Sequence, residues 1–401
     1  MSSSRFSRAR LARMHGILAA GVESGEVPGV ATLIERGGEL HIDTIGLKTL
    51  GSRDAIRRDT IFRIASMTKP ITAVAAMILV EECKLRLDEP LDRLLPELAK
   101  RSVLKRIDGP LDETVPAHRP LTVRDLLTFR MGFGMIMGPP NEYPIQKAIT
   151  ESQLMSLKPA PPHTPDEWVR RLGALPLMYQ PGERWMYHTG SDVLGVLIAR
   201  ASGKSFEAFL RERVFELLGM KDTGFSVPAA KLDRLASCYQ VNPQTRALEL
   251  YDDAQASSWA APPVFPAGGG GLVSTLEDYH AFGRMLLSGG RHGNERILSH
   301  AGVATMTTDQ LSAEEKAAAI FMPGWFDSRG WGFGVSIVTR RESLATSPGQ
   351  FGWGGAFGTS WISDPREDLV AVLMTQCMDF PPRPTGIRAD FLTCVYQALE
   401  D

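Results

Sequence analysis

Residues 61–85 have the sequence IFRIASMTKPITAVAAMILVEECKL, which joins a short reactive pattern to a long apolar segment. Ser66 lies three residues before Lys69, and the run from Thr68 to Val80 predicts a buried helix that begins near the serine. Positions i and i+3 share one face of a helix, so we expect the Ser66 hydroxyl and the Lys69 amine to touch. An amine at that distance can take the hydroxyl proton and turn the oxygen into a nucleophile. The stretch therefore predicts an acyl-transfer serine enzyme of the S-x-x-K type.

The same four-residue pattern occurs a second time, at Ser102 to Lys105, and a chain of this length holds about one match by chance. The second copy lies in RSVLKRIDGP, a short charged segment closed by Gly-Pro that predicts a loop. The first copy opens an apolar helix, whose N-terminal N–H groups favour developing negative charge. On the residues alone a simpler interpretation stays open, in which Ser66 caps the helix and Lys69 is solvated.

Composition narrows the class of protein. The chain has 401 residues, 43% of them hydrophobic and 22% charged, which suits two structural units with a substantial core. The net charge is −2 and no basic run stands out, so neither nucleic acid nor an anionic membrane is an expected partner. The four cysteines form no C-x-x-C pair and the eight histidines no metal-binding spacing. We expect reduced thiols, a cytoplasmic location, no metal and no cofactor.

The first 22 residues have a basic start and a short apolar patch. Leu11, Met14, Leu18 and Val22 recur at helical spacing with arginines among them, whereas a signal peptide would have an uninterrupted apolar stretch. This pattern predicts an amphipathic helix of the mature fold. No run in the chain approaches the roughly twenty apolar residues of a membrane span.

The order of predicted elements indicates a mixed α/β (α+β) fold. A hairpin is predicted at 30–46 and three strands near the C-terminus, followed by an amphipathic helix; helical spacing dominates the middle, and a Pro-rich stretch predicts a long irregular loop. We expect one antiparallel sheet of five or more strands flanked by helices, with a helical insertion. Residues 1–66 and 261–401 would form the α/β sheet domain and 67–260 the mostly helical domain, with the active site in the cleft between them. The C-terminal strands are expected at 331–341, 358–364 and 368–376, the helices at 121–132, 191–203, 205–219 and 388–400, and the loop at 139–165.

Taken in order, these segments resemble the serine beta-lactamase superfamily, in particular its class C-like branch with the family VIII carboxylesterases and related acyltransferases. The resemblance covers nearly the whole chain and is more specific than any single motif. It implies a beta-lactamase/transpeptidase-like fold and an acyl-serine mechanism. The matching segments are FRIASMTKPITA (62–73), LDEPLDRLLPEL (87–98), LTVRDLLTFRMGF (121–133), PGERWMY through GMKDTGF (181–225) and AGGGGLVSTLEDYHAFGRMLLSGG (267–290).

The resemblance implies Ser66 as the nucleophile, Lys69 as its proton acceptor and Tyr187 as the family tyrosine that moves a proton between nucleophile and leaving group. A phenol hydrogen-bonded to an ammonium has its anion stabilised, so Lys69 and Tyr187 are expected to share one proton near neutral pH. Thr189 stands where the lactamases usually have Asn, which leaves its role open. His188 is expected to be exposed or structural.

Gly352 to Ala356 is the third element of the resemblance, and Trp353, Gly354 and Gly355 stand where the family has Lys-Thr-Gly. Glycine here would let a substrate approach an edge strand closely. The N–H of Ala356, with that of Ser66, would form the oxyanion hole, each donor stabilising the intermediate by about 3–4 kcal/mol.

Trp353 decides the expected substrate class. The family lysine helps hold the carboxylate of an antibiotic, and an indole carries no charge with which to do so. Losing a charged contact costs about 1.5–3 kcal/mol, which favours neutral esters over lactams. The W-G-G form is similar to that of the family VIII esterases.

The sequence therefore predicts a serine carboxylesterase that hydrolyses small or medium neutral esters and whose partner is a small-molecule ester. A beta-lactamase, a D-peptidase or an acyltransferase on the same scaffold is the alternative, and a non-catalytic binding module is the rival outside catalysis. The Met- and aromatic-rich stretch 129–137 is assigned to core packing rather than to an acyl pocket. The run Gly268 to Gly271 lacks the lysine of a phosphate loop, and no G-x-S-x-G elbow occurs.

Overall fold

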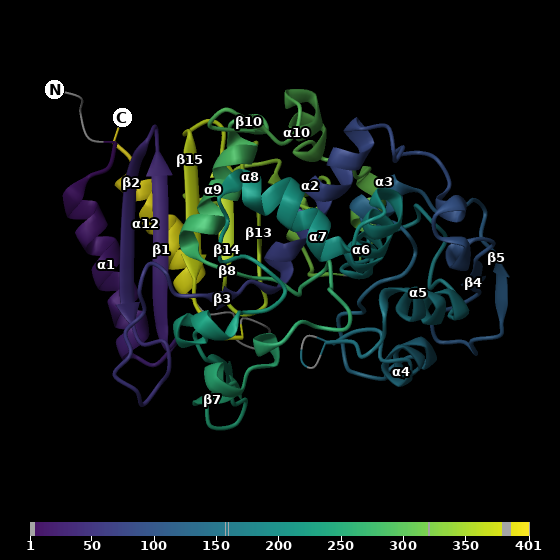
Figure 1. Ribbon diagram of the computed structural model, residues 1–401, viewed down its shortest axis with the longest axis horizontal. Coiled ribbons are helices and arrows are strands. Elements are labelled where there is room, and N and C mark those ends of the chain that lie inside the picture. The colour runs from purple at the N-terminus through teal and green to yellow at the C-terminus, as the bar shows by residue number, and fades with distance from the viewer. Residues whose placement is uncertain (1–4, 157, 159, 320, 379–385, 401) are drawn as a thin grey trace.

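One seven-stranded antiparallel sheet organises the molecule, with strand order β11-β12-β13-β14-β15-β1-β2 (Figure 1). The computed structural model describes residues 5–156, 158, 160–319, 321–378 and 386–400. The two N-terminal strands join the C-terminal ones through β1 and β15, which pair from Ala31 with Met374 to Arg36 with Leu369. The mixed α/β class with an antiparallel sheet is thus confirmed. The strands of the sheet are β1 (Gly29–Arg36), β2 (Glu39–Gly46), β11 (Arg329–Trp331), β12 (Ser336–Val338), β13 (Phe351–Gly354), β14 (Ser360–Asp364) and β15 (Leu369–Met374).

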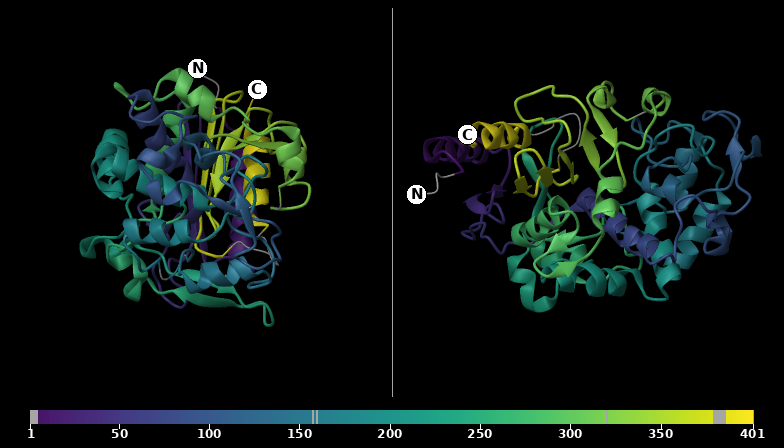
Figure 2. Two further views of the ribbon diagram at one scale, coloured as in Figure 1. Left: turned by 90° about the vertical axis from the view of Figure 1, so that its right-hand side faces the viewer. Right: turned by 90° about the horizontal axis from the view of Figure 1, so that it is seen from above.

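Helices cover both faces of this sheet because side chains alternate along its strands. On β1, Leu33 belongs to the main core, whereas Ile34 belongs to a second cluster shared with the terminal helices. Helices α1 (Arg8–Glu23) and α12 (Ile387–Ala398) lie side by side on that second face, and α9 (Leu276–Leu287) packs on the other (Figures 1 and 2). The amphipathic N-terminal helix expected from the sequence is therefore part of the fold.

The remaining helices gather beside the sheet, around α2 (Thr68–Glu81). Every residue of α2 from Thr68 to Leu79 is buried, as expected for a helix that is apolar on all sides. It packs against α6 and α7, and these residues continue the main core. The other helices are α3 (Val123–Leu127), α4 (Pro144–Glu151), α5 (Pro165–Ala174), α6 (Thr189–Ser202), α7 (Phe206–Leu210), α8 (Glu216–Leu218), α10 (His300–Met306) and α11 (Ala313–Ala317).

Short two-stranded pairs complete the fold. Two segments of the chain differ from what the sequence predicts. The second S-x-x-K copy, predicted to be a loop, lies partly in strand β4, which pairs with β5. The Pro-rich stretch 139–165 is not irregular throughout, since Pro144 begins α4 with its fixed backbone angle; its residues 157 and 159 lie outside the described residues. These pairs are β3 (Phe62–Arg63) with β8 (Val273–Ser274), β4 (Ser102–Leu104) with β5 (Thr114–Pro116), β6 (Cys238–Val241) with β7 (Leu248–Asp252), and β9 (Arg291–His292) with β10 (Glu295–Arg296).

Two strand predictions need correction. The stretch 331–341, expected as one strand, folds back as the hairpin β11–β12, with Gly334 at a φ of 73° that favours glycine. The sequence also predicts an edge strand at Trp353, yet β13, which contains this residue, lies inside the sheet between β12 and β14.

All four cysteines are free thiols, and three of them are buried. In the part of the chain that is described, no helix has the length and apolar character needed to cross a membrane.

Candidate active site

The segment around Ser66 is held in place by backbone pairing and an unusual backbone angle. Strand β3 pairs with β8 immediately before it, and Ala65 has a φ of 42°, a left-handed conformation that few non-glycine residues adopt. Ser66 then lies in a single 3₁₀ turn, Ala65–Met67, that leads directly into α2. The buried Tyr279 hydroxyl donates to the Met67 carbonyl at 2.8 Å and fixes that turn. Ser66 itself is only partly buried.

Lys69 lies one turn further along α2 and is fully buried. Its Nζ is 3.1 Å from Ser66 Oγ, as the i, i+3 spacing predicts. Nζ also contacts His188 Nδ1 at 3.1 Å and donates to the Gly269 carbonyl. Removal from water disfavours the ammonium, so burial lowers the pKa of Lys69 to about 7, with the nearby Asp192 charge acting in the opposite direction. Lys69 is therefore available as a neutral amine near neutral pH.

Tyr187 is buried among aromatic side chains beside Ser66 and Lys69. Its ring stacks on Trp185 with centroids 5.6 Å apart and meets Phe129 edge-on at 5.7 Å. Burial raises the pKa of Tyr187 above its ordinary value, while hydrogen bonds to Ser66 and Trp353 oppose that effect less strongly. The Lys69 amine lies over the ring face, 4.4 Å from the centroid. The structure does not favour the expected sharing of one proton, because burial disfavours the phenolate and the Lys69 amine lies over the ring face.

The segment that follows β13 lies against the Ser66 turn. A side chain on Gly355 would overlap the Ile64 carbonyl oxygen, so only glycine lets the two segments approach this closely. Ala356 and Ala65 belong to one small apolar cluster. Trp353 does more than lack a charge, since its indole Nε1 donates to the Tyr187 hydroxyl at 2.9 Å. The structure therefore brings Trp353 to Ala356 together with Ser66, Lys69 and Tyr187.

The sequence-based interpretation missed the contacts that His188, Asp192 and Gly269 make in this site and left the role of Thr189 open. His188, expected to be exposed or structural, is only 9% exposed and contacts the Lys69 amine. Thr189, at the position of the family Asn, is buried with a hydroxyl that has no hydrogen-bond partner among the described residues. Asp192 and Gly269 join the cluster through a hydrogen bond from the Gly269 N–H to Asp192 Oδ1, at 2.7 Å. The glycine run was the available signal, but nothing local shows which carbonyl meets a lysine 200 residues away.

A groove of about 480 Å³ begins at Trp353 and Gly354 and extends towards α12. The Arg388 guanidinium lines this groove and lies close to Gly354, since a Cβ added to that glycine would be 2.8 Å from Nη1.

The Met- and aromatic-rich stretch divides between two environments: Phe129, Met131 and Phe133 are buried, whereas 135–137 line a separate small cavity. In the described ranges, no group of three or more His, Cys, Asp or Glu side chains is arranged to hold a metal ion.

Comparison with known proteins assigns the chain to a family. The family described as Beta-lactamase matches residues 14–394. The chain belongs to the beta-lactamase family. Among similar proteins, Rv1367c of Mycobacterium tuberculosis is 38% identical over 366 residues, covering 89% of this chain and 88% of its own. Esterase EstB of Burkholderia gladioli is 29% identical over 386 residues, covering 91% and 90%.

The fold has close counterparts among solved structures. EstCE1, described as a hydrolase with promiscuous acyltransferase activity, superposes with a TM-score of 0.80 at 24% identity, over 97% of this chain and 99% of its own. At that identity the likeness establishes the fold alone. The family match and the relatives together make this chain a serine hydrolase of the beta-lactamase family.

Proposed function

We propose that this protein is a carboxylesterase that hydrolyses neutral carboxylic esters through an acyl intermediate on Ser66. One observation carries the proposal: a buried amine with a pKa of about 7 lies 3.1 Å from the hydroxyl of a partly buried serine. A general base works best when its pKa lies near the working pH, and burial brings Lys69 into that range.

The contacts suggest how each group would act. Lys69 takes the Ser66 proton while Oγ attacks the ester carbonyl carbon, and the N–H groups of Ser66 and Ala356 hold the developing oxyanion. When the intermediate collapses, the Tyr187 hydroxyl gives its proton to the departing alkoxide oxygen, and the proton held on Lys69 later restores the phenol. Water then attacks the acyl-serine by the same route in reverse and releases the acid.

Trp353 supports neutral esters as the substrate class. Its indole N–H is already used on Tyr187 and it brings no charge for a carboxylate. The relative EstB is named as an esterase, in agreement with this choice. Two described arginines, Arg329 and Arg388, line the groove, and Arg388 lies beside Gly354, so charged and neutral substrates need direct comparison.

Three substrates decide the proposal: a short-chain nitrophenyl ester, the matching ester with a terminal carboxylate on the acyl chain, and a cephalosporin. We expect the neutral ester to have the highest kcat/KM, and Ser66→Ala to abolish its turnover. A fluorophosphonate probe should add one adduct to the wild-type chain and none to Ser66→Ala by intact mass. Preference for the cephalosporin would reassign the activity, and the absence of any adduct would favour a binding protein.

A further inference from the structure

The hydrogen-bond valence of Lys69 singles out His188. A neutral amine has two N–H donors and one lone pair. Besides Ser66 Oγ, the Nζ atom contacts two acceptors, the Gly269 carbonyl oxygen and His188 Nδ1. If both N–H groups point at these acceptors, the lone pair is left facing the Ser66 hydroxyl. That is the orientation a base needs to remove the serine proton.

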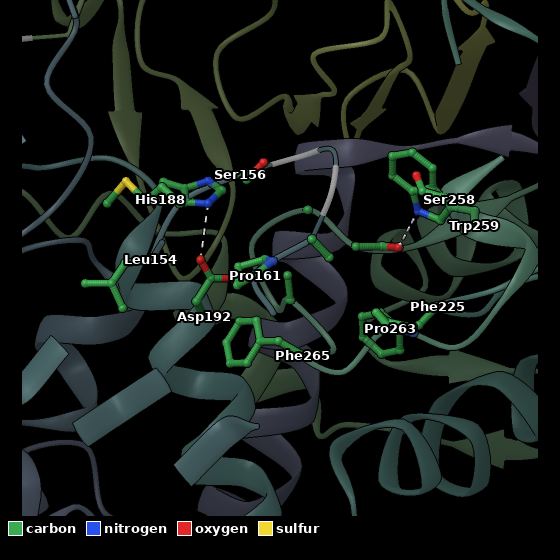
Figure 3. Close-up of a pocket in the computed structure, with 15 residues that line it drawn as sticks. Leu154, Ser156, Pro161, His188, Asp192, Phe225, Ser258, Trp259, Pro263 and Phe265 are labelled. Atoms are coloured by element: carbon green, nitrogen blue, oxygen red, sulfur yellow. Dashed lines mark hydrogen bonds and ion pairs between the residues drawn. The ribbon is translucent and has the colours of Figure 1, made fainter. Parts of the chain in front are cut away.

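This orientation requires His188 Nδ1 to accept, which it does only when the ring proton is on Nε2. Nε2 lies 3.2 Å from Asp192 Oδ2, and the two side chains point at each other across the first turn of α6 (Figure 3). The other oxygen, Oδ1, is held by the Gly269 N–H at 2.7 Å. A carboxylate accepts only, so it keeps the proton on Nε2 and fixes the tautomer.

The backbone is shaped to make this contact. His188 has a φ of 89°, strained for a residue with a side chain, and stands immediately before α6. The i, i+4 spacing then brings Asp192 to its ring. A side chain on Gly269 would lie 2.9 Å from Asp192 Oδ1 and 3.0 Å from His188 Cε1, so glycine is needed for the backbone to close the cluster.

Behind the pair lies a narrow cavity of about 40 Å³, with walls that include Phe225, Trp259 and Phe265. It has room for only a few water molecules, so the Asp192 charge is weakly screened. The titratable side chains recorded in contact with His188 are Lys69, Asp192 and the Tyr187 ring. Burial lowers the pKa of His188, and the Lys69 charge lowers it further whenever the amine is protonated, so both favour the neutral ring.

We propose that His188 and Asp192 are positioning residues that aim the Lys69 lone pair at Ser66, with Asp192 setting the His188 tautomer. The inference rests on the proposed Ser66–Lys69 chemistry and adds two residues to it. His188 contacts the Lys69 amine and Asp192 contacts His188, so both act on Ser66 through the amine.

Asp192→Asn makes a sharp prediction. The Gly269 N–H keeps the amide oxygen on its side, so the amide NH₂ faces His188 Nε2 and drives the ring proton to Nδ1. Nδ1–H then meets the Lys69 amine, which turns its lone pair towards histidine and away from Ser66. We expect kcat on the nitrophenyl ester to fall by about 100-fold, the lower end of the contribution of a general base.

His188→Asn is the matched variant, because its amide oxygen takes the place of Nδ1 while the side chain is too short to reach Asp192. It should retain kcat within about tenfold of wild type, whereas His188→Ala should lose about 100-fold. In the His188→Asn background, Asp192→Asn should cost less than about threefold, since no ring tautomer remains to be changed. A purely structural role of Asp192 would give the same loss in both backgrounds.

The pH profile gives an independent measurement. The Asp192 charge raises the Lys69 pKa, so Asp192→Asn should move the acid limb of kcat/KM below its wild-type position near pH 7 while the plateau falls. If Asp192→Asn fails to fold, the comparison of His188→Asn with His188→Ala decides alone, and equal rates would overturn the inference. Wild-type turnover with all of these variants unaffected would refute the positioning pair and leave the esterase standing, whereas an inactive wild type would refute the esterase.

Discussion

Lys69 and Tyr187 flank the same serine and are both buried, yet their surroundings push them to opposite tasks. Lys69 meets a ring of polar acceptors, and burial lowers its pKa to about 7. Tyr187 is enclosed by aromatic rings, and burial raises its pKa. Desolvation favours the neutral form of both groups. In the mechanism proposed above, this single physical cause lets the amine act as the base and the phenol as the acid.

The largest expected effect comes from removing the base. Lys69→Met keeps the volume and apolar stem but has no lone pair for the serine proton, so kcat should fall by about 10³–10⁴-fold. The second S-x-x-K copy provides a control, since Lys105 is exposed beyond the end of strand β4. Steady-state kinetics on the nitrophenyl ester should show Lys105→Met at the wild-type rate. An equal loss for Lys105→Met would contradict the assignment of the base to the S-x-x-K copy at the start of α2.

Removing the acid should give a smaller loss that depends on the alcohol. Tyr187→Phe keeps the aromatic packing but cannot protonate the departing oxygen, so kcat for an alkyl ester should fall by about 10²–10³-fold. A nitrophenolate leaves without a proton and should be affected far less. The measured quantity is the ratio of the two losses in the same variant. Equal losses would assign Tyr187 to the attack step together with Lys69.

The contrast between the two sides could be anticipated from the sequence only in part. The i, i+3 spacing of Ser66 and Lys69 is local, and the apolar run after them indicates burial. The sequence alone therefore predicts the contact between Ser66 and a buried Lys69. The turn near residue 37 and the continuous apolar run of β15 likewise indicate strands of the sheet. The contacts of His188 and Gly269 with Lys69 depend on chain segments far apart and on a strained φ, which no local pattern reveals.

The same limit explains the errors in the fold. The split of residues 331–341 turns on Gly334 and on the carbonyl of Lys69, which lies where a side chain on that glycine would be. Helix α4 begins at a proline, a residue that the composition of its segment had assigned to a loop. In both cases one residue, Gly334 or Pro144, decides the local structure, and a pattern averaged over the whole segment does not reveal it.

The smallest expected effect refines the acid side. Trp353→Phe removes the indole N–H that donates to the Tyr187 oxygen while retaining the aromatic contact. A hydrogen bond of this kind contributes about 1 kcal/mol, so kcat on the alkyl ester should fall roughly fivefold. In the Tyr187→Phe background the same change should have no effect on kcat. A fivefold loss in both backgrounds would instead place the indole against the substrate.

The pH dependence of covalent labelling tests the central claim most directly, namely that a neutral Lys69 activates Ser66. The second-order rate of fluorophosphonate adduct formation, followed by intact mass, isolates attack by the serine from later steps. The account predicts a rate that rises with pH to a plateau with a midpoint of about 7, because the amine accepts the proton only after losing its own. A rate that stays flat from about pH 5 to 9, or that rises only near the ordinary lysine pKa of about 10.4, would contradict it.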